Sequence, residues 1–384
     1  MVNVPFFSHV AAAARVSRVL VEQGHEVISW GPERFRTTIE SSGAAFRLHA
    51  PEMPLAATTH LAFITLLADM LEQQTEELID QLFDEDLDLL IHDSQVPWAR
   101  IAGDYLGLPR LITNPMYPIS DTHRIASPDD PVGVSVDREE GIRRVEACWM
   151  RVGSRWGIEL GSWATMVHSS YGRRETVMAF TTEEVVGAGM LDDRWRFIGP
   201  LMDDIPPAPR NGGRPLVYAC FGTSFNRRPE QFTSVIEGVA DLPVDAVISM
   251  GRGPMGYGRL SADDLGALPP NVVVQDYADN RELLRRASIH ITHAGCNSTH
   301  ESLLAGVPML CLPQAYDQFP LAWRIAGLGA GSVLEESPES VRQGVLWLLE
   351  DDGPTRRAQQ LREMLLSFDG PGNVATVVQE ALDR

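Results

Sequence analysis

The stretch HAGCNSTHE, His293–Glu301, follows the apolar run Ser288–Thr292 and decides how the second half of the chain is organised. The apolar run predicts a short buried strand, and the glycine-containing turn leads into a helix that opens at Asn297–Thr299. Ser298 and Glu301 have the spacing of a capping box, which is typical of a helix start. A helix start presents unpaired backbone N–H groups and the positive end of the helix dipole. The stretch therefore predicts a binding site for an anion such as a phosphate group.

A second buried strand and a polar pair follow that helix. Gly306–Pro308 leads into the apolar run Pro308–Pro313, and Asp317 and Gln318 come just beyond its carboxyl end. Ligands of open α/β sheets bind at the carboxyl ends of the strands. We therefore expect Asp317 and Gln318 to bind hydroxyl groups beside the anion site.

These residues resemble the nucleotide-sugar signature of family 1 glycosyltransferases, and within it the macrolide glycosyltransferase branch of bacteria. That signature has a His, a Gly-rich turn, Ser/Thr and Glu, then Gly-Val-Pro and a final Asp-Gln. Weaker similarities lie at Ser8–Val10, Leu90–Asp93 and Val217–Thr223. The resemblance implies the GT-B fold, with two Rossmann-like α/β domains facing across a cleft and a C-terminal helix that crosses back to the first domain.

Composition limits the classes of function. The chain has 384 residues, 44% of them apolar, which is enough for two or three domains with their own cores. A net charge of −20 disfavours nucleic acid and anionic membrane surfaces as partners. The start has no basic segment typical of a signal peptide, and no apolar run is long enough to span a bilayer. The four cysteines are widely spaced and indicate reduced thiols, so we expect a cytoplasmic protein. The oligomeric state is left open.

Apolar runs alternate with amphipathic segments, which predicts parallel sheets flanked by helices. The Pro/Gly-rich run Gly199–Gly213 predicts a linker. We therefore expect an acceptor-binding domain at 1–200, a linker at 201–214, a nucleotide-sugar-binding domain at 215–367, and a helix at 368–384 that packs back on the first domain. The region from 115 to 174 is expected to be irregular, apart from one helical stretch. Other predicted segments are the strands Val2–Phe7 and Leu87–His92 and the helices Val10–Gln23, His60–Phe83, Pro97–Leu106, Pro229–Val239 and Pro338–Glu350.

His9 and Asp93 are the candidate catalytic residues. His9 stands at the start of a predicted helix, where the positive end of the dipole disfavours the imidazolium and leaves a neutral base. The resemblance places the catalytic His at this turn, although Ser8 replaces the usual Gly. Asp93 ends a predicted strand, and the resemblance implies that its carboxylate orients His9. The alternatives are a His that only caps the helix and an Asp that caps the helix after Ser94.

The remaining candidates bind the donor. The resemblance implies that the diphosphate is held by the turn at 293–299, that a second turn at 222–224 faces the same cleft, and that Glu301 accepts hydrogen bonds from the ribose. It further implies that Asp317 and Gln318 bind the sugar, and that Asn280 takes the place of a Gln that contacts the base. Whether the base is uridine or thymidine stays open. The residues of the two turns are Gly222, Thr223, Ser224, His293, Gly295, Asn297, Ser298 and Thr299.

Trp149 and Trp163 are expected either to border a bulky hydrophobic acceptor, such as a polyketide or macrolide, or to belong to the core. Asp84–Asp86 has the Asp-x-Asp spacing of a metal site, but an acidic, solvated surface is the favoured interpretation. We expect no metal cofactor, because Arg252, Arg324 and the helix start can neutralise the leaving diphosphate. The predicted reaction is an inverting glycosyl transfer. A nucleotide-sugar epimerase and a non-catalytic partner of a transferase are the alternatives.

Overall fold

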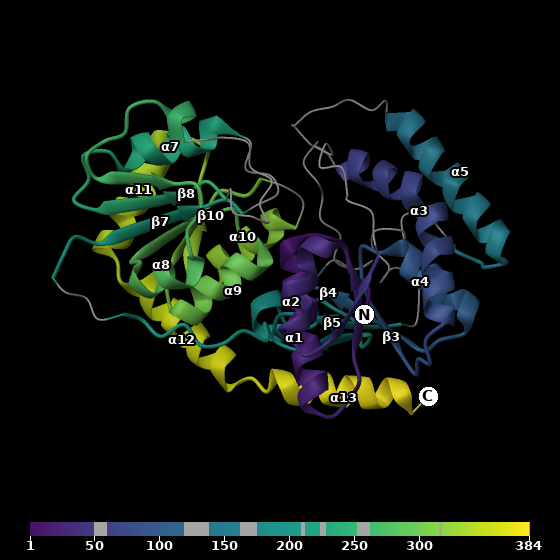
Figure 1. The fold of residues 1–384 in the computed structure, drawn as a ribbon. Helices are drawn as coiled ribbons and strands as arrows, with labels where there is room; N and C mark the ends of the chain where they lie inside the picture. Colours follow the sequence, from purple (N-terminus) through teal and green to yellow (C-terminus); the bar gives the residue numbers. More distant parts are fainter. Residues whose placement is uncertain are drawn as a thin grey trace. The chain divides into compact units, whose positions relative to one another are not determined.

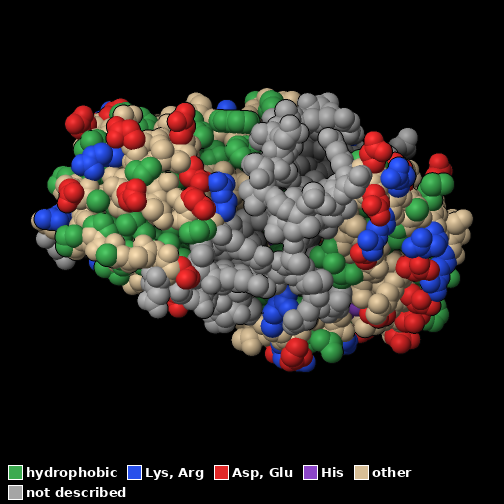
Figure 2. All heavy atoms as spheres, turned by 90° about the horizontal axis from the view of Figure 1, so that it is seen from above, with side chains coloured by type: hydrophobic (Ala, Val, Ile, Leu, Met, Phe, Trp, Pro, Cys, Tyr) green, Lys and Arg blue, Asp and Glu red, His purple; other side chains and the backbone are tan. Residues whose placement is uncertain are grey.

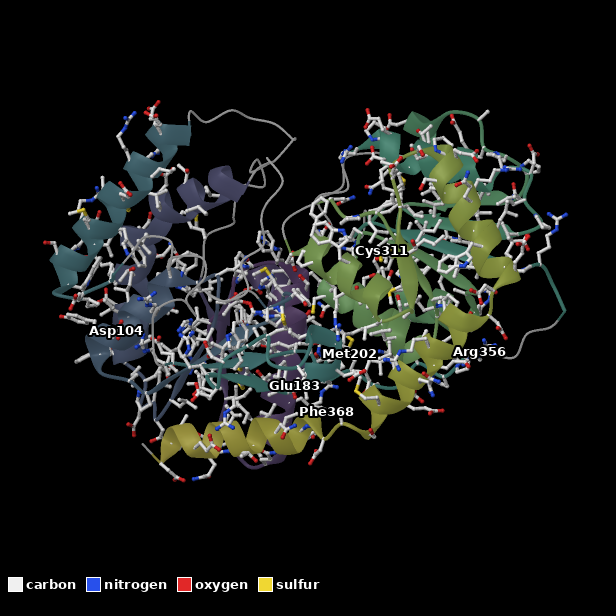
Figure 3. All side chains as sticks on the ribbon, turned by 180° about the vertical axis from the view of Figure 1, so that it is seen from behind. Asp104, Glu183, Met202, Cys311, Arg356 and Phe368 are labelled. Carbon is white, nitrogen blue, oxygen red and sulfur yellow. The ribbon has the colours of Figure 1, made fainter. Side chains whose placement is uncertain are left out.

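The computed structural model divides into two compact units, each an α/β structure (Figure 1). The first unit comprises Met1–Phe180, Ala188–Leu201 and Asp369–Arg384, and the second comprises Thr181–Gly187 and Met202–Phe368. Glu183, Met202 and Phe368 mark places where the chain passes from one unit to the other (Figure 3). The structure describes residues 1–49, 60–118, 138–161, 175–208, 212–222, 228–251, 262–314 and 317–383.

Parallel strands form the centre of the first unit. Strands β1 and β2 form a two-stranded sheet, and the other four strands form a second sheet with the order β3-β4-β5-β6. Val2 makes isolated bridges to Trp30 of β1 and to His92 of β3, so the N-terminal segment joins the two. The strands are β1 (Ile28–Gly31), β2 (Ala45–Leu48), β3 (Leu90–Asp93), β4 (Arg110–Asn114), β5 (Thr176–Ala179) and β6 (Trp195–Phe197).

The prediction of a strand at Val2–Phe7 is confirmed only for Val2, which makes isolated bridges, and is wrong for the residues after it. The N–H of Phe6 donates to the carbonyl oxygen of Val4 at 2.8 Å, a tight turn, and helix α1 (Phe7–Glu22) begins at the next residue. Pro5 explains the difference, because proline has no N–H to donate to a sheet ladder. The turn brings His9 into the first turn of α1.

Helices cover both faces of the first unit's sheet. On one face α3 packs against α4 and α5, and on the other α1 packs against α13. Helix α5 confirms the helical stretch predicted within the region 115–174, where Val145, Cys148, Trp149 and Val152 recur at helical spacing and are all buried. The helical bounds are α3 (His60–Phe83), α4 (Pro97–Leu106), α5 (Arg138–Trp156), α13 (Gly370–Leu382) and the short η1 (Glu33–Phe35) and α2 (Arg36–Glu40).

The second unit has a six-stranded parallel sheet with the order β12-β11-β10-β7-β8-β9. The strand order reverses between β7 and β10, which is where α/β sheets of this kind bind ligands. The predicted strands at Ser288–Thr292 and Pro308–Pro313 are confirmed as β10 and β11, whereas β12 was not predicted. The strands are β7 (Leu216–Cys220), β8 (Asp245–Ser249), β9 (Val272–Gln275), β10 (Ile289–Thr292), β11 (Met309–Cys311) and β12 (Gly331–Val333).

Helices cover both faces of this sheet as well: α7 packs with α11 on one side, and α8, α9 and α12 lie on the other (Figure 1). Helix α10 begins at Gln318, the second residue of the polar pair, and Asp317 is its N-cap. The bounds are α7 (Pro229–Val239), η3 (Ala262–Leu265), α8 (Asn280–Arg286), α9 (Cys296–Ala305), α10 (Gln318–Gly327), α11 (Pro338–Glu350) and α12 (Gly353–Ser367).

The segment Thr181–Gly187 belongs to the second unit, although its place in the sequence put it in the predicted domain 1–200. It contains the short helix α6 (Glu183–Val186). Arg324 of α10 donates to the carbonyl oxygens of Val185 at 3.0 Å and Glu184 at 2.8 Å. Tertiary hydrogen bonds between residues 139 and 140 positions apart therefore override the chain order.

The described part of the predicted linker lies against helix α8. Arg281 donates to the carbonyl oxygens of Asp203 at 3.2 Å and Asp204 at 2.9 Å, and Arg285 donates to Pro206 at 3.1 Å. By contact, Met202 and the residues after it belong to the second unit. The backbone of residues 203–206 is therefore fixed to α8 by hydrogen bonds from two arginine side chains.

Charged side chains of both signs lie interspersed on the described surface (Figure 2). Glu85, in the Asp-x-Asp stretch, pairs with Arg47 at 2.8 Å, and Arg155 pairs with Glu72 at 2.8 Å between α5 and α3. Exposed pairs of this kind stabilise a fold by at most about 1 kcal/mol. None of the described helices combines the length and apolar character that a membrane crossing needs.

Candidate active site

His9 and Asp93, which lie 84 positions apart in sequence, meet in the first unit. His9 Nδ1 and Asp93 Oδ2 are 2.6 Å apart, and the two residues are 6% and 0% exposed. The other carboxylate oxygen, Oδ1, accepts the backbone N–H of Gln95 at 2.8 Å. A carboxylate accepts hydrogen bonds and cannot donate, so Nδ1 of His9 carries the proton in this pair. Nε2 is then the ring nitrogen left to accept one.

Asp93 is not the cap of the following helix. The residue before α4 is Val96, and among the described residues no side chain caps that helix. The neighbouring His92 lies on the opposite face of the strand, as alternation predicts. Burial lowers the pKa of His92 to about 3, so its ring is neutral at ordinary pH. Of the two adjacent polar residues, only Asp93 is paired with His9.

In the second unit, Gly222 and His293 follow the adjacent strands β7 and β10, where the strand order reverses. A Cβ atom on Gly222 would lie 2.9 Å from His293 Nε2, and one on Gly295 would lie 2.3 Å from the same atom. Gly222 also has a φ of +74°, which side chains rarely adopt. Both positions therefore require glycine for the imidazole to sit where it does.

The His293 ring is a neutral imidazole in this setting. Burial lowers its pKa to about 4. Its Nδ1 is buried and makes no hydrogen bond to any residue that the structure describes. A ring nitrogen without a partner among the described residues, beside two glycines at a helix start, fits a group that donates to or accepts from a ligand.

Helix α9 begins at Cys296, and its N-cap is Gly295. The predicted capping box of Ser298 and Glu301 is wrong, since within the described chain no side chain caps α9. The N–H of Thr299 already donates to the carbonyl oxygen of Gly295 at 2.9 Å, so Ser298 lies inside the first turn. The start of the helix is thus left to backbone groups, as an anion site requires.

The side chains of Ser298 and Thr299 point into buried surroundings. Ser298 Oγ lies 3.3 Å from Thr292 Oγ1 at the end of β10. Thr299 is 0% exposed, and its Oγ1 has no hydrogen-bond partner in the described residues. Asn297, between Cys296 and Ser298, is only partly buried. The structure therefore brings the predicted diphosphate residues of 293–299 together in one turn.

Glu301 and Asn280, predicted to contact ribose and base, contact each other. Asn280 Nδ2 donates to Glu301 Oε2 at 3.1 Å, and the Tyr218 hydroxyl bonds to Asn280 Oδ1. The sequence pattern missed Tyr218. Alternation along β7 was the available signal, since it places Tyr218 and Cys220 on one face and the core residues Val217 and Ala219 on the other.

Asp317 and Gln318 lie at the start of α10, but they differ in environment. Asp317 is the N-cap residue and is partly buried. Gln318 is 6% exposed, and its Oε1 accepts the backbone N–H of Gln314 at 2.8 Å. Gln318 therefore supports the preceding loop, and Asp317 is the better placed of the two for a sugar hydroxyl.

Trp149 lies in the core of the first unit. It is 2% exposed, its indole N–H donates to the carbonyl oxygen of Gly161 at 3.2 Å, and the Arg100 guanidinium lies 5.7 Å from its ring centre. This burial supports the core alternative and argues against direct contact with an acceptor. The candidates Thr223, Ser224 and Trp163, as well as Arg252, lie outside the described residues.

Comparisons with known proteins agree with this geometry. Residues 255–381 match the model of the erythromycin biosynthesis protein CIII-like C-terminal domain. The demethyllactenocin mycarosyltransferase of Streptomyces fradiae is 26% identical over 100% of this chain and 87% of its own length. The oleandomycin glycosyltransferase of Streptomyces antibioticus is 25% identical over 100% of this chain and 90% of its own.

The fold is likewise shared with solved structures. The crystal structure of the glycotransferase of kitacinnamycin matches with a TM-score of 0.82 at 21% identity, covering 99% of this chain and 97% of that one. With the two α/β units and the signature at the reversal of strand order, these likenesses support a glycosyltransferase of GT-B fold, similar to family 1 members of the macrolide-type bacterial branch.

Proposed function

We propose that this glycosyltransferase moves a sugar from a uridine or thymidine diphosphate donor to a hydroxyl group of a bulky hydrophobic small molecule of the polyketide or macrolide type. The names of the two relatives support the acceptor class, since one is a mycarosyltransferase and the other an oleandomycin glycosyltransferase. The observation that carries the proposed chemistry is the pair of His9 Nδ1 and Asp93 Oδ2 at 2.6 Å.

In the proposed reaction, His9 Nε2 removes the proton of the acceptor hydroxyl. Because a general base must lie within hydrogen-bond reach of that proton, the acceptor is bound beside His9. The buried Asp93 carboxylate holds the ring in the required tautomer and stabilises the imidazolium that forms. The activated oxygen then attacks the anomeric carbon opposite the diphosphate, which inverts the configuration.

The leaving nucleoside diphosphate binds at the start of α9. The backbone of Gly295 and the first turn of the helix favour the developing negative charge. We expect this charge to be met without a metal ion. Arg324 takes no part, since its guanidinium is hydrogen-bonded to the carbonyl oxygens of Glu184 and Val185.

A transfer assay tests the proposal. Uridine and thymidine diphosphate sugars are offered with macrolide aglycones, with and without a chelator, and the anomeric configuration of the product is read by NMR. We expect inverted product and no loss of rate with the chelator. Product of retained configuration would rule out the single displacement, and a rate abolished by chelation and restored by a divalent ion would rule out the metal-independent route.

The two alternatives have distinct outcomes. An epimerase would change a labelled nucleotide sugar without any acceptor. A non-catalytic partner of another transferase would neither transfer sugar nor slowly hydrolyse the donor by itself. The full-length similarity to two named transferases favours transfer over both. The cytoplasmic location stays a prediction.

A further inference from the structure

Three polar side chains from β7, α8 and α9 are joined by two consecutive hydrogen bonds. The Tyr218 hydroxyl bonds to Asn280 Oδ1, and Asn280 Nδ2 donates to Glu301 Oε2 at 3.1 Å. The residues come from three elements of the second unit: Tyr218 from β7, Asn280 from the first turn of α8, and Glu301 from α9. These hydrogen bonds therefore link β7, a central strand of the sheet, to α9, the helix at the proposed anion site.

The direction of this hydrogen-bonded chain follows from the chemistry of its members. A carboxylate only accepts, so the amide NH2 of Asn280 must face Glu301. The amide oxygen then faces Tyr218, whose hydroxyl supplies the proton. If the amide were turned over, its oxygen would face the carboxylate and two acceptors would oppose each other. The Tyr218 hydroxyl therefore selects the one orientation in which Asn280 binds Glu301.

Tyr218 is itself held rigidly. It is 0% exposed, and its ring is stacked on His290, with 5.1 Å between ring centres and 5° between planes. His290 Nδ1 lies 2.5 Å from Ser302 Oγ, which in turn donates to the carbonyl oxygen of Ser298 at 2.9 Å. Burial raises the pKa of Tyr218 well above its ordinary value, so the hydroxyl keeps its proton at physiological pH.

We propose that Tyr218 and Asn280 are positioning residues, which hold the Glu301 carboxylate so that it accepts hydrogen bonds from the ribose hydroxyls of the donor. The inference rests on the proposed function and extends it, since it gives Asn280 a role through Glu301 in place of a contact with the base. Losing Asn280 removes its hydrogen bond to the Glu301 carboxylate, and losing the Tyr218 hydroxyl removes the group that orients Asn280 for that bond. The affinity that comes from the ribose hydroxyls then falls, while the affinity for the rest of the nucleotide stays.

The experiment separates this role from a general structural one. Calorimetry measures the binding of uridine diphosphate and thymidine diphosphate, and of their 2′,3′-dideoxy and 3′-deoxy analogues, which lack the ribose hydroxyls. We expect the natural nucleotides to bind wild-type protein roughly tenfold more tightly than the analogues, as for hydrogen bonds to a charged group. The ratio of the affinity for the natural nucleotide to the affinity for its analogue should fall at least about threefold in Tyr218→Phe and in Asn280→Ala. The affinity for the analogue itself should be unchanged.

Controls define what would overturn the inference. Tyr105→Phe removes the same hydroxyl from an exposed tyrosine of the first unit, and it should leave the ratio at the wild-type value. Equal losses for natural nucleotide and analogue, or an unchanged ratio in both variants, would overturn the positioning role and leave the proposed function standing. If wild-type protein bound neither nucleotide, the proposed function and this inference would fail together. Asn280→Ala, at a partly exposed site, serves as the test if Tyr218→Phe does not fold.

Discussion

His9 and His293 are the same side chain used in two different settings. His9 lies at the start of α1 with its Nδ1 against a buried carboxylate at 2.6 Å. His293 follows β10 between two glycines, and burial without a carboxylate partner lowers its pKa to about 4. The first setting suits the proposed base, whose ring would gain a proton during the reaction. The second suits the proposed diphosphate site, where a neutral ring would lie beside negative charge.

The difference shows that the partner of Nδ1 decides what an imidazole can do. A carboxylate fixes the tautomer and compensates the positive charge, which suits a base. A site without a carboxylate avoids competition with the diphosphate for the backbone N–H groups of α9. The following experiments test this contrast, beginning with the largest expected effect.

His9→Ala removes the proposed base. We expect the transfer rate to fall by about 10²- to 10⁴-fold, the range of general base catalysis, while nucleotide binding is unchanged because the donor residues lie in the other unit. Single-turnover transfer and calorimetry with uridine and thymidine diphosphates measure the two quantities. Near-normal turnover in this variant would show that His9 is not the base.

Asp93→Asn keeps the size of the side chain and removes its charge. We expect a smaller loss of transfer rate than in His9→Ala, because the ring remains but its cation is less stabilised. The comparison of the two rates under identical donor saturation is the measurement. A loss larger than that of His9→Ala would mean that Asp93 has a role beyond supporting the ring.

Gly295→Ala tests the setting of His293. The added Cβ would lie 2.3 Å from His293 Nε2, so the ring or the turn must move. Overpacking of this kind costs about 1–3 kcal/mol, so we expect nucleotide affinity to fall about tenfold or more. Gly327→Ala is the matched control, because a Cβ there has nothing within 4 Å and α10 continues helical backbone. Equal nucleotide affinities in the two variants would show that the close approach of Gly295 to His293 is unimportant for binding.

Low pH should destabilise the protein through its buried neutral imidazoles. Burial lowers the pKa of His49 to about 4 and that of His290 to about 3, from an ordinary value of 6.5. The unfolded chain therefore binds more protons below pH 6.5, and stability present in full above that pH is lost as the pH falls toward 4. We expect the melting temperature to fall on the order of 5 °C between pH 7 and pH 5.

Variants of single histidines sharpen that measurement. His49→Phe should flatten the pH dependence, since neither ring nitrogen of His49 has a hydrogen-bond partner among the described residues. The exposed His25 is the control, and His25→Gln should reproduce the wild-type slope. If both variants behaved alike, the acid sensitivity would have to come from groups other than His49.

Much of the fold could be predicted because local signals mark its elements. Helices α4, α7 and α11 each begin at a proline, and their predicted bounds, Pro97–Leu106, Pro229–Val239 and Pro338–Glu350, are confirmed. The strand–turn–helix around His293 is also confirmed, since a short apolar run followed by glycine is a strong pattern. By contrast, the capping box at Ser298 was a local pattern that the backbone did not use, because α9 had already begun at Cys296.

The sequence by itself determined the family resemblance, the parallel sheets and the turns that carry His9 and His293, because these depend on residue type and short spacing. Only the tertiary structure decided that Trp149 is a core residue, that Thr181–Gly187 joins the second unit, and that Asn280 binds Glu301 and Tyr218. The physical reason is that burial and side-chain partners depend on contacts between residues far apart in the chain. Their distance in sequence carries no signal of whether they meet in the fold.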